Sequence, residues 1–296
     1  MIKNNGYCLP LLRDVIGRSF ILTYKEDPNR LEAALREEGL CPELIRASYT
    51  PDQMQYTNAM RTFMNHYEAW HRACEKEDYT LICEADFVPC VDLGTMPIFW
   101  PLQNPLAWGY LYQGSPRLLA LIGKERFLRA HTTPLVSYVI NAAVAKILIR
   151  FYGEELTRYS PKSYFTFDSH LQWFAMGQGA EAYIPLRHYG EHGGMPNPEH
   201  AQLGRLPRAG VHRADNLEKR LRFLPDYARG SRVRYFVERC KGRLFGWARL
   251  LSGAWVSKTN VYEISPIMMA RMYVVGAKRL AGFGGTNCGL KERADV

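Results

Sequence analysis

Two periodicities of apolar residues alternate along the first two thirds of the chain. Short apolar runs rich in β-branched and aromatic residues are typical of buried strands, and they cover 18–24, 44–48, 79–83, 107–114 and 180–185. Segments with apolar residues three or four positions apart are typical of helices, and they cover 29–40, 57–77, 135–153 after a short initial strand, and 168–179. This alternation of strands and helices predicts an α/β fold with a largely parallel sheet.

Two acids, Glu84 and Asp86, directly follow the apolar run 79–83. Burying a carboxylate without a compensating partner is strongly unfavourable. In α/β sheets, ligands bind outside the carboxyl ends of the strands, so we expect both side chains just past the core, facing a ligand crevice. Two acids at alternate positions can help to hold a hard divalent cation, with diphosphate oxygens completing its shell. The alternative is an ordinary polar loop after a strand.

The chain changes character after 190–210, a stretch rich in Gly and Pro that we interpret as a linker or lid. Beyond it, an apolar stripe follows a helical rhythm, with Arg and Lys at many of the positions between. The stripe consists of Val233, Phe236, Val237, Cys240, Leu244, Trp247, Leu251 and Trp255. A second apolar helical segment covers 265–283.

Charge separates the two parts of the chain. Between Arg205 and Arg249, Lys and Arg outnumber Asp and Glu by nine, which equals the net charge of +9 of the whole chain. Three interpretations of this basic amphipathic segment stay open: it lies on an anionic membrane surface, it binds nucleic-acid phosphates, or it packs its stripe on the rest of the protein. Since no zinc-finger, RRM or KH signature is recognisable, we expect no nucleic acid. A non-catalytic nucleic-acid- or membrane-binding protein is the alternative to an enzyme.

Cysteine usage and hydropathy indicate a cytoplasmic protein. The seven cysteines are odd in number and include no CxxC pair, which favours reduced thiols over a disulfide framework or a zinc ribbon. The N-terminus lacks the apolar region of a secretory signal, and no apolar run reaches the roughly 18 residues that a membrane span needs. We expect the cytoplasm, with the basic segment on the inner membrane face if it binds lipid.

Five short motifs follow one another over roughly residues 18–190. They are "FILTYKEDPNR" (20–30), "NHYEAW" (65–70), "CEAD" (83–86), "YVINAAVAKIL" (138–148) and "FDSHL" (167–171). Their order and spacing resemble glycosyltransferase family 25, which includes bacterial lipooligosaccharide galactosyltransferases. The chain has Thr23, Asn65 and Ala85 where the family has Asn, Ser and Asp.

This resemblance implies a GT-A-type, Rossmann-like domain and a nucleotide-sugar-dependent glycosyltransferase. The donor would be a UDP-sugar, with galactose as the first candidate hexose. The acceptor would be a glycolipid or oligosaccharide, as in lipopolysaccharide biosynthesis. Apart from the resemblance, we expect the loops around 92–106 and 115–134 to select the acceptor. Mn²⁺ or Mg²⁺ would neutralise the departing diphosphate as a Lewis acid, and the resemblance alone implies inversion at the sugar.

The resemblance also implies roles for individual residues. Asp86 is the expected direct metal ligand, and Glu84 would orient it or bind the ribose or the donor sugar. Thr23, Arg30 and His66 are the other candidates for binding the donor. The structural alternatives are a solvated helix charge for Arg30 and, for His66, packing of its helix onto the sheet.

Asp168 and His188 complete the candidate site. Asp168 stands where a helix begins, so it is an N-cap, a general base for the acceptor hydroxyl, or a ligand of the donor sugar. His188, Glu191 and His192 match the H-x-x-E-H pattern of one metalloprotease class, but the glycines and prolines around them predict a loop instead of the helix that this chemistry needs. His188 closely follows the last predicted strand, so we expect it, as the late His of GT-A enzymes, on the metal or the diphosphate, with a surface loop as the alternative.

Together these patterns predict three parts. A GT-A-like catalytic domain covers 1–195, a linker or lid covers 196–215, and a basic amphipathic helical extension covers 216–296.

Overall fold

The computed structural model describes residues 9–123, 127–195, 211–257 and 264–282. The strands are β1 (Ile16–Thr23), β2 (Pro42–Arg46), β3 (Tyr79–Glu84), β4 (Phe87–Pro89), β5 (Ala107–Tyr110), β6 (Gly114–Ile122), β7 (Phe127–Thr133), β8 (Ser137–Ile140), β9 (Glu181–Ile184) and β10 (Gly190–His192). The α-helices are α1 (Leu12–Val15), α2 (Asn29–Glu37), α3 (Asn58–Ala73), α4 (Ala142–Arg158), α5 (Phe167–Gly177), α7 (Arg232–Leu251) and α8 (Pro266–Leu280). Short 3-10 turns cover Gln53–Gln55, Leu93–Thr95 and Asp226–Ala228.

In the described part of the chain, eight strands form one sheet in the order β2-β1-β3-β8-β5-β9-β7-β6. Strand β1 runs parallel to β2 and β3, and β5 runs parallel to β9, whereas the other four pairings are antiparallel. The predicted α/β class is therefore confirmed, but the expectation of a largely parallel sheet is wrong. One reason is the antiparallel hairpin of β6 and β7, which lies in the region 115–134 that we expected to be loop.

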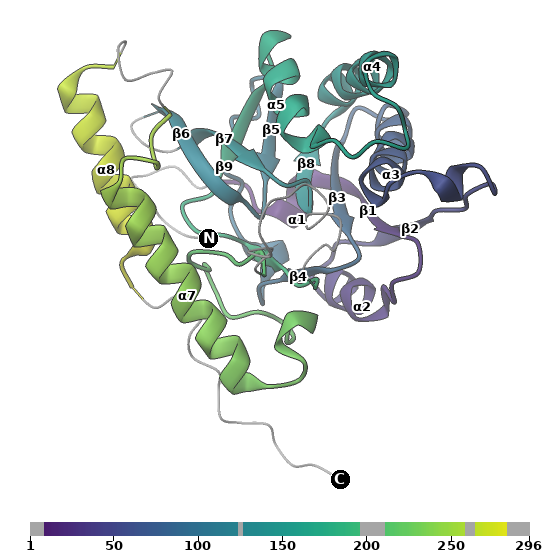
Figure 1. Cartoon of the computed structure of the whole chain (residues 1–296). Coiled ribbons are helices and arrows are strands. Elements are labelled where there is room, and N and C mark those ends of the chain that lie inside the picture. The colour runs from purple at the N-terminus through teal and green to yellow at the C-terminus, as the bar shows by residue number, and fades with distance from the viewer. Residues whose placement is uncertain (1–8, 124–126, 196–210, 258–263, 283–296) are drawn as a thin grey trace.

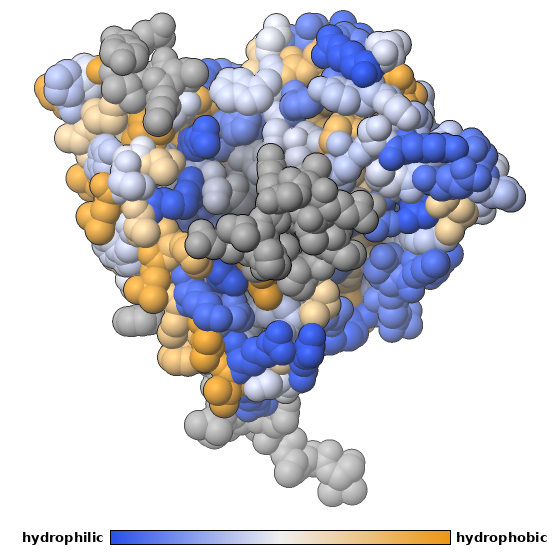
Figure 2. Space-filling view, in the orientation of Figure 1, coloured by the Kyte–Doolittle hydropathy of each residue, from blue (hydrophilic) through white to orange (hydrophobic). Residues whose placement is uncertain are grey.

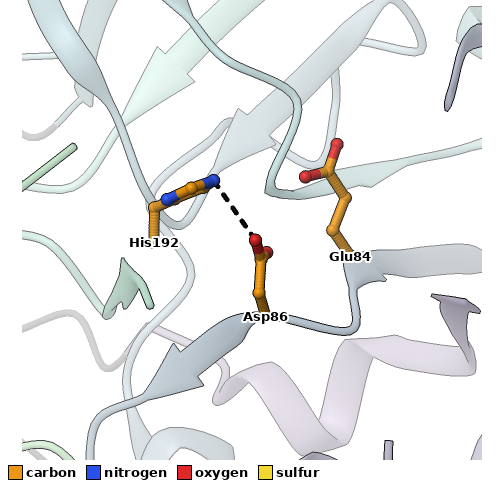
Figure 3. Close-up of side chains that lie close together, drawn as sticks. All are labelled: Glu84, Asp86 and His192. Atoms are coloured by element: carbon orange, nitrogen blue, oxygen red, sulfur yellow. Dashed lines mark ion pairs between the residues drawn. The ribbon is translucent and has the colours of Figure 1, made fainter. Parts of the chain in front are cut away.

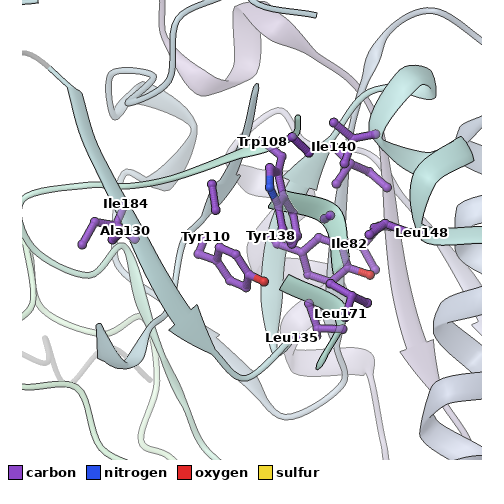
Figure 4. Packing of buried hydrophobic residues seen from close by; sticks show 14 of the residues in the cluster. Ile82, Trp108, Tyr110, Ala130, Leu135, Tyr138, Ile140, Leu148, Leu171 and Ile184 are labelled. Carbon is purple, nitrogen blue, oxygen red and sulfur yellow. The ribbon is translucent and has the colours of Figure 1, made fainter. Parts of the chain in front are cut away.

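Helices cover both faces of this sheet (Figure 1). Side chains alternate between the faces, as strand geometry requires: Phe20 and Leu22 belong to one apolar cluster and Ile21 to the other. The first cluster includes buried residues of α3, α4 and α5, and Figure 4 shows its centre, where Trp108, Tyr110 and Tyr138 pack together. The second cluster includes residues of α1, α2 and the segment 90–100.

Helices α7 and α8 lie along one side of the molecule, next to β6 (Figure 1). The N–H of Leu118 in β6 donates to the carbonyl of Trp255 at 2.7 Å, and the N–H of Ser257 donates back to Leu118 at 3.0 Å. Met272 and Val275 of α8 belong to the first core cluster. None of the helices in the described ranges has the length and hydrophobicity needed to span a bilayer.

The structure also refines the predicted linker. Residues 190–192, expected in a loop, form β10, so this prediction is wrong for these three positions. Positions 196–210 lie outside the described residues. Of the predicted linker 196–215, the structure describes 211–215, and there Ala214 is fully buried, so this end of the segment packs against the protein.

Candidate active site

Glu84 and Asp86 lie at the carboxyl end of β3, beside the end of β1. Glu84 is the last residue of β3 and stands opposite Leu22 of β1 in the parallel register. The next N–H, that of Ala85, donates to the carbonyl of Leu22 at 2.9 Å, and the chain then turns into β4. The side chains of Glu84 and Asp86 are 24% and 26% exposed, so both carboxylates lie partly buried at the end of the sheet.

A third side chain, His192, arrives from a distant part of the sequence. Strands β10 and β4 form a two-stranded antiparallel sheet in which His192 stands opposite Phe87. This pairing brings His192 Nε2 to 3.3 Å from Asp86 Oδ2 (Figure 3). Ligand atoms of Glu84, Asp86 and His192 all lie within 4.8 Å of one another, which is a spacing that one metal ion can bridge.

Glycines after β10 make this close approach feasible. The N–H of Gly193 donates to the carbonyl of Asp86 at 2.8 Å. A Cβ atom on Gly194 would lie 2.3 Å from Asp86 Oδ2 and 3.0 Å from His192 Cε1. A side chain at this position would therefore collide with the carboxylate.

The trio also has unused hydrogen-bonding capacity. Asp86 Oδ1 and His192 Nδ1 are buried, and neither has a hydrogen-bond partner among the described residues. Buried polar atoms are normally satisfied, so the unsatisfied oxygen of Asp86 marks a place where a ligand is expected. Two carboxylates and an imidazole suit Mn²⁺, and the carboxylates alone suit Mg²⁺. The residues present therefore fit the divalent ion that the sequence motifs imply.

A chain of buried hydrogen bonds orients the side chain of Glu84. Trp70 Nε1 donates to the hydroxyl of Tyr138 at 2.8 Å, and the same hydroxyl lies 2.8 Å from His66 Nδ1. On the other side of the ring, His66 Nε2 lies 3.1 Å from Glu84 Oε1. His66 is fully buried, so it orients Glu84 and at the same time packs α3 onto the sheet.

The two acids have opposite pKa shifts. Burial raises the pKa of Asp86 above its usual range, and the nearby Glu84 adds to this while His192 opposes it. Burial also acts to raise the pKa of Glu84, but its hydrogen bond and charge interaction with His66 outweigh burial, so the pKa of Glu84 lies below its usual value. A cation bound between them would favour the ionised form of both groups.

A cavity of about 530 Å³ adjoins the trio. Its volume falls in the range of small-molecule sites. Its walls come from the end of β1, the first half of α3, the segment before α5 and the residues around β10, and its polar lining includes Thr23, Tyr24, Lys25, Glu26, Tyr49, Arg61, Asn65, Glu84, Asp86, Asp168, His192 and His212.

Asp168 lines the same cavity, but it is not the helix cap. Helix α5 begins at Phe167 with Thr166 as its N-cap residue, so Asp168 lies within the first turn and the expectation of an N-cap is wrong. Its Oδ1 accepts a hydrogen bond from the N–H of Ser169 at 2.8 Å. Burial raises the pKa of Asp168, and the nearby charge of Glu84 acts in the same direction.

The structure places His188 in a different environment. Its ring is fully buried, the N–H of Gln113 donates to Nδ1 at 3.1 Å, and Nε2 lies 2.9 Å from Asp215 Oδ1. Both nitrogens are therefore engaged away from Asp86. Burial and the charge of Arg279 lower the pKa of His188 to about 4, so the ring is neutral near pH 7. Arg279 of α8 bonds to the same Asp215 oxygen at 3.0 Å, which links His188 to α8.

Of the two other predicted donor-binding residues, Thr23 lies in the cavity wall and Arg30 does not. Thr23 lines the cavity, and its hydroxyl donates to the carbonyl of Glu26 at 2.9 Å. Arg30 lies outside the cavity wall, with its guanidinium 4.3 Å from the ring centroid of Phe223 and 3.8 Å from Asp226.

The H-x-x-E-H pattern does not form a metalloprotease site. Glu191 points away from His192: its carboxylate is fully buried and accepts hydrogen bonds from Arg239 at 3.0 Å and from the N–H of Ala214 at 2.8 Å. His188 lies in the separate network described above, so the three side chains do not converge. Sequence reasoning did not identify His192 as a candidate metal ligand. Its position beside Asp86 depends on the pairing of β10 with β4, about 100 residues away in the sequence, which no local pattern reveals.

Comparisons with known proteins add little to this geometry. No family model matches the chain, and no relative was found among curated proteins. Among solved structures, the chain is similar to one described as a glycosyltransferase involved in the glycosylation of the major capsid of PBCV-1, with a TM-score of 0.37 and 11% identity, covering 57% of this chain and 81% of that chain. None of these comparisons identifies a family for the chain.

Proposed function

We propose that this chain is a divalent-metal-dependent glycosyltransferase that uses a nucleoside-diphosphate sugar. The observation that supports the proposal most directly is the trio Glu84, Asp86 and His192, with an unsatisfied oxygen on Asp86, in the wall of a cavity of about 530 Å³. The motifs that resemble family 25 supply the substrate class. On that basis the donor is a UDP-hexose, with UDP-galactose as the first candidate, and the acceptor is a glycolipid or polysaccharide precursor.

In this proposal, Asp86 and His192 hold the metal and Glu84 completes or orients its shell. When bound, the ion supplies Lewis-acid neutralisation of the departing diphosphate. His66 contributes indirectly, because its hydrogen bond holds Glu84 in one orientation. The metal role that the sequence suggested for His188 passes to His192.

The aromatic wall of the cavity is the proposed site for the nucleobase. Tyr24 and Tyr49 both line the cavity, and their ring centroids are 4.9 Å apart. The guanidinium of Arg61 lies 5.9 Å from the ring centroid of Tyr24 and 5.8 Å from that of Tyr49. A planar base can stack on such rings, and the positive charges of Arg61 and Lys25 favour an anionic phosphate nearby. Arg30 does not line the cavity, so we give it no role in this proposal.

Asp168 is the proposed general base. The acceptor hydroxyl would attack the anomeric carbon, the bond between that carbon and the diphosphate oxygen would break, and the hydroxyl proton would pass to the carboxylate of Asp168. Because burial raises the pKa of Asp168, its carboxylate is a stronger base than an exposed one. Inversion at the anomeric carbon would follow from this single displacement.

Release of UDP from UDP-hexoses, measured with Mn²⁺ and with EDTA, tests the proposal. We expect release only with the metal, a loss of roughly 10²-fold or more in Asp86→Asn, and a fall in turnover of roughly 10²- to 10⁴-fold in Asp168→Asn with little change in donor KM. Glu154→Gln makes the same carboxylate-to-amide change at the surface of α4, where Glu154 pairs with Arg158, and should behave as wild type. If no UDP-hexose is bound or hydrolysed in either condition, or if Asp86→Asn keeps full activity, the proposal is wrong.

A further inference from the structure

Helix α7 turns its small and polar side chains inward. Its buried residues are Glu238, Arg239, Gly242, Gly246 and Leu250. A Cβ atom on Gly242 would lie 2.4 Å from the carbonyl oxygen of Ala214, and one on Gly246 would lie 2.6 Å from Leu280 Cδ2. Arg239 also bonds to the buried Glu191 at 3.0 Å and to the carbonyl of Ala214 at 2.8 Å. These contacts fix the rotation of the helix about its axis.

The apolar stripe therefore points outward. Along this stripe on α7, the exposed fraction of the large apolar side chains ranges from 37% for Trp247 to 83% for Leu251. The outer face of α7 consists of Val233, Phe236, Val237, Cys240, Leu244, Trp247 and Leu251. Only Trp255 of the predicted stripe is buried, beyond the end of the helix, where its Nε1 donates to the carbonyl of Met272 at 3.0 Å. Figure 2 shows apolar side chains gathered along the side of the molecule formed by α7 and α8.

Such a face requires an explanation. Soluble proteins rarely expose contiguous apolar patches, and large ones mark interaction sites. The pattern repeats on α8, where Ile267 is 75% exposed and Val274 is 51% exposed. Two adjacent helices thus expose large apolar side chains, although the amphipathic rule places such residues against the core.

The charges around the outer face indicate which partner fits. Arg232, Arg234 and Lys241 are exposed and occupy helical positions on either side of the stripe, and Arg271 and Lys278 are exposed on α8. Helix α7 contains one acid, Glu238, which is buried and paired with Arg213 at 2.7 Å and Lys241 at 2.7 Å. Helix α8 contains no acid. An apolar stripe with basic edges and an interfacial Trp complements the surface of an anionic bilayer, which offers apolar chains below negative headgroups.

We propose that the outer face of α7, with the exposed side chains of α8 beside it, docks on an anionic lipid bilayer. The helices would lie in the plane of the membrane surface, with Leu244 and Leu251 entering the acyl boundary and the basic side chains meeting lipid phosphates. This inference goes beyond the proposed transferase activity and does not depend on it, because binding to vesicles requires neither metal nor nucleotide.

Flotation with vesicles of phosphatidylglycerol and phosphatidylcholine tests the inference, with vesicles of phosphatidylcholine alone for comparison. We expect the full chain to float only with the anionic vesicles, and binding to weaken as ionic strength rises. The double variant L244S/L251S should lower the partition coefficient about tenfold or more, and Arg234→Gln should lower it about fivefold at low salt. Leu156→Ser, at an exposed apolar position of α4, is the matched control and should bind as wild type.

Three results would overturn the inference. The first is absence of vesicle binding by the wild type at low salt, and the second is binding by L244S/L251S equal to that of Leu156→Ser. The third is a self-association in analytical ultracentrifugation that L244S/L251S abolishes while vesicles remain unbound, which would assign the face to a second copy of the chain. Thermal melting of each variant checks folding, and the single variant Leu251→Gln replaces the double one if that does not fold.

Discussion

Asp86 is the residue at which two distant segments meet. It follows β3, its carboxylate faces His192 of β10, and its carbonyl accepts the N–H of Gly193. The spacing of the trio therefore depends on how closely the backbone after β10 approaches this one carboxylate. Gly194, whose missing side chain leaves room for Asp86 Oδ2, controls that approach.

We expect Gly194→Ala to weaken Mn²⁺ binding about tenfold, or roughly 1.4 kcal/mol, because the new methyl group would displace the Asp86 carboxylate. Isothermal titration calorimetry measures the Mn²⁺ affinity, and thermal melting checks the fold. The control is Gly153→Ala on α4, where a Cβ meets nothing within 4 Å, so it should leave metal affinity unchanged and stabilise the helix slightly. Equal Mn²⁺ affinity in both variants would refute this role for Gly194.

At the residue scale, local patterns located the two carboxylates of the proposed metal site but not its histidine. Glu84 and Asp86 could be placed at a sheet end because a clear apolar run precedes them, and the position of a carboxylate after a strand is a local property. His192 could not be chosen over His188, because the choice depends on the pairing of β10 with β4. The partner of His188 is Asp215, in a segment with no recognisable strand or helix pattern.

At the scale of elements, α7 reverses the usual relation between pattern and burial. Its apolar stripe was predictable from the helical spacing of the residues, but amphipathicity alone would turn the stripe toward the core. The inward face is instead selected by close packing at Gly242 and Gly246 and by the ion pair of Arg239 with Glu191. These contacts depend on distant segments, so the sequence left the orientation open.

We expect Gly246→Leu to destabilise the protein by about 1–3 kcal/mol, because the added side chain overpacks the contact with Leu280. Leu244→Ser lies two residues away on the outer face and should change stability by no more than about 0.5 kcal/mol. Urea unfolding of both variants measures the difference. Greater destabilisation by Leu244→Ser than by Gly246→Leu would mean that the stripe is buried in solution.

Strand direction was the other element-scale property that the sequence did not reveal. The helices between 29 and 73 and the parallel strands around β1 follow the predicted alternation. The hairpin of β6 and β7 follows instead from cross-strand pairing, with Ile122 opposite Phe127. Apolar runs indicate that a strand is buried but do not encode whether its neighbour runs parallel.

At the scale of the whole molecule, β10 connects the two proposed surfaces. His192 points toward Asp86, whereas the adjacent Glu191 forms a buried ion pair with Arg239 on the inner face of α7. Some basic side chains thus form ion pairs inside the protein, as Arg279 with Asp215 also illustrates, whereas Arg232, Arg234 and Lys241 lie exposed beside the outer face of α7. One face of this short strand therefore contributes to the proposed metal site, and its other face holds α7, the helix that carries the proposed membrane-docking face.

The proposed function depends on a divalent metal ion held by Glu84, Asp86 and His192. The most direct measurement is the anomalous difference density of Mn²⁺ in crystals of the protein with UDP, compared with crystals of Asp86→Asn prepared in the same way. We expect one peak within bonding distance of Asp86 and His192, next to the diphosphate, and no peak there in the variant. A peak at another site, a peak that Asp86→Asn retains, or bound UDP without a metal beside these residues would contradict the account.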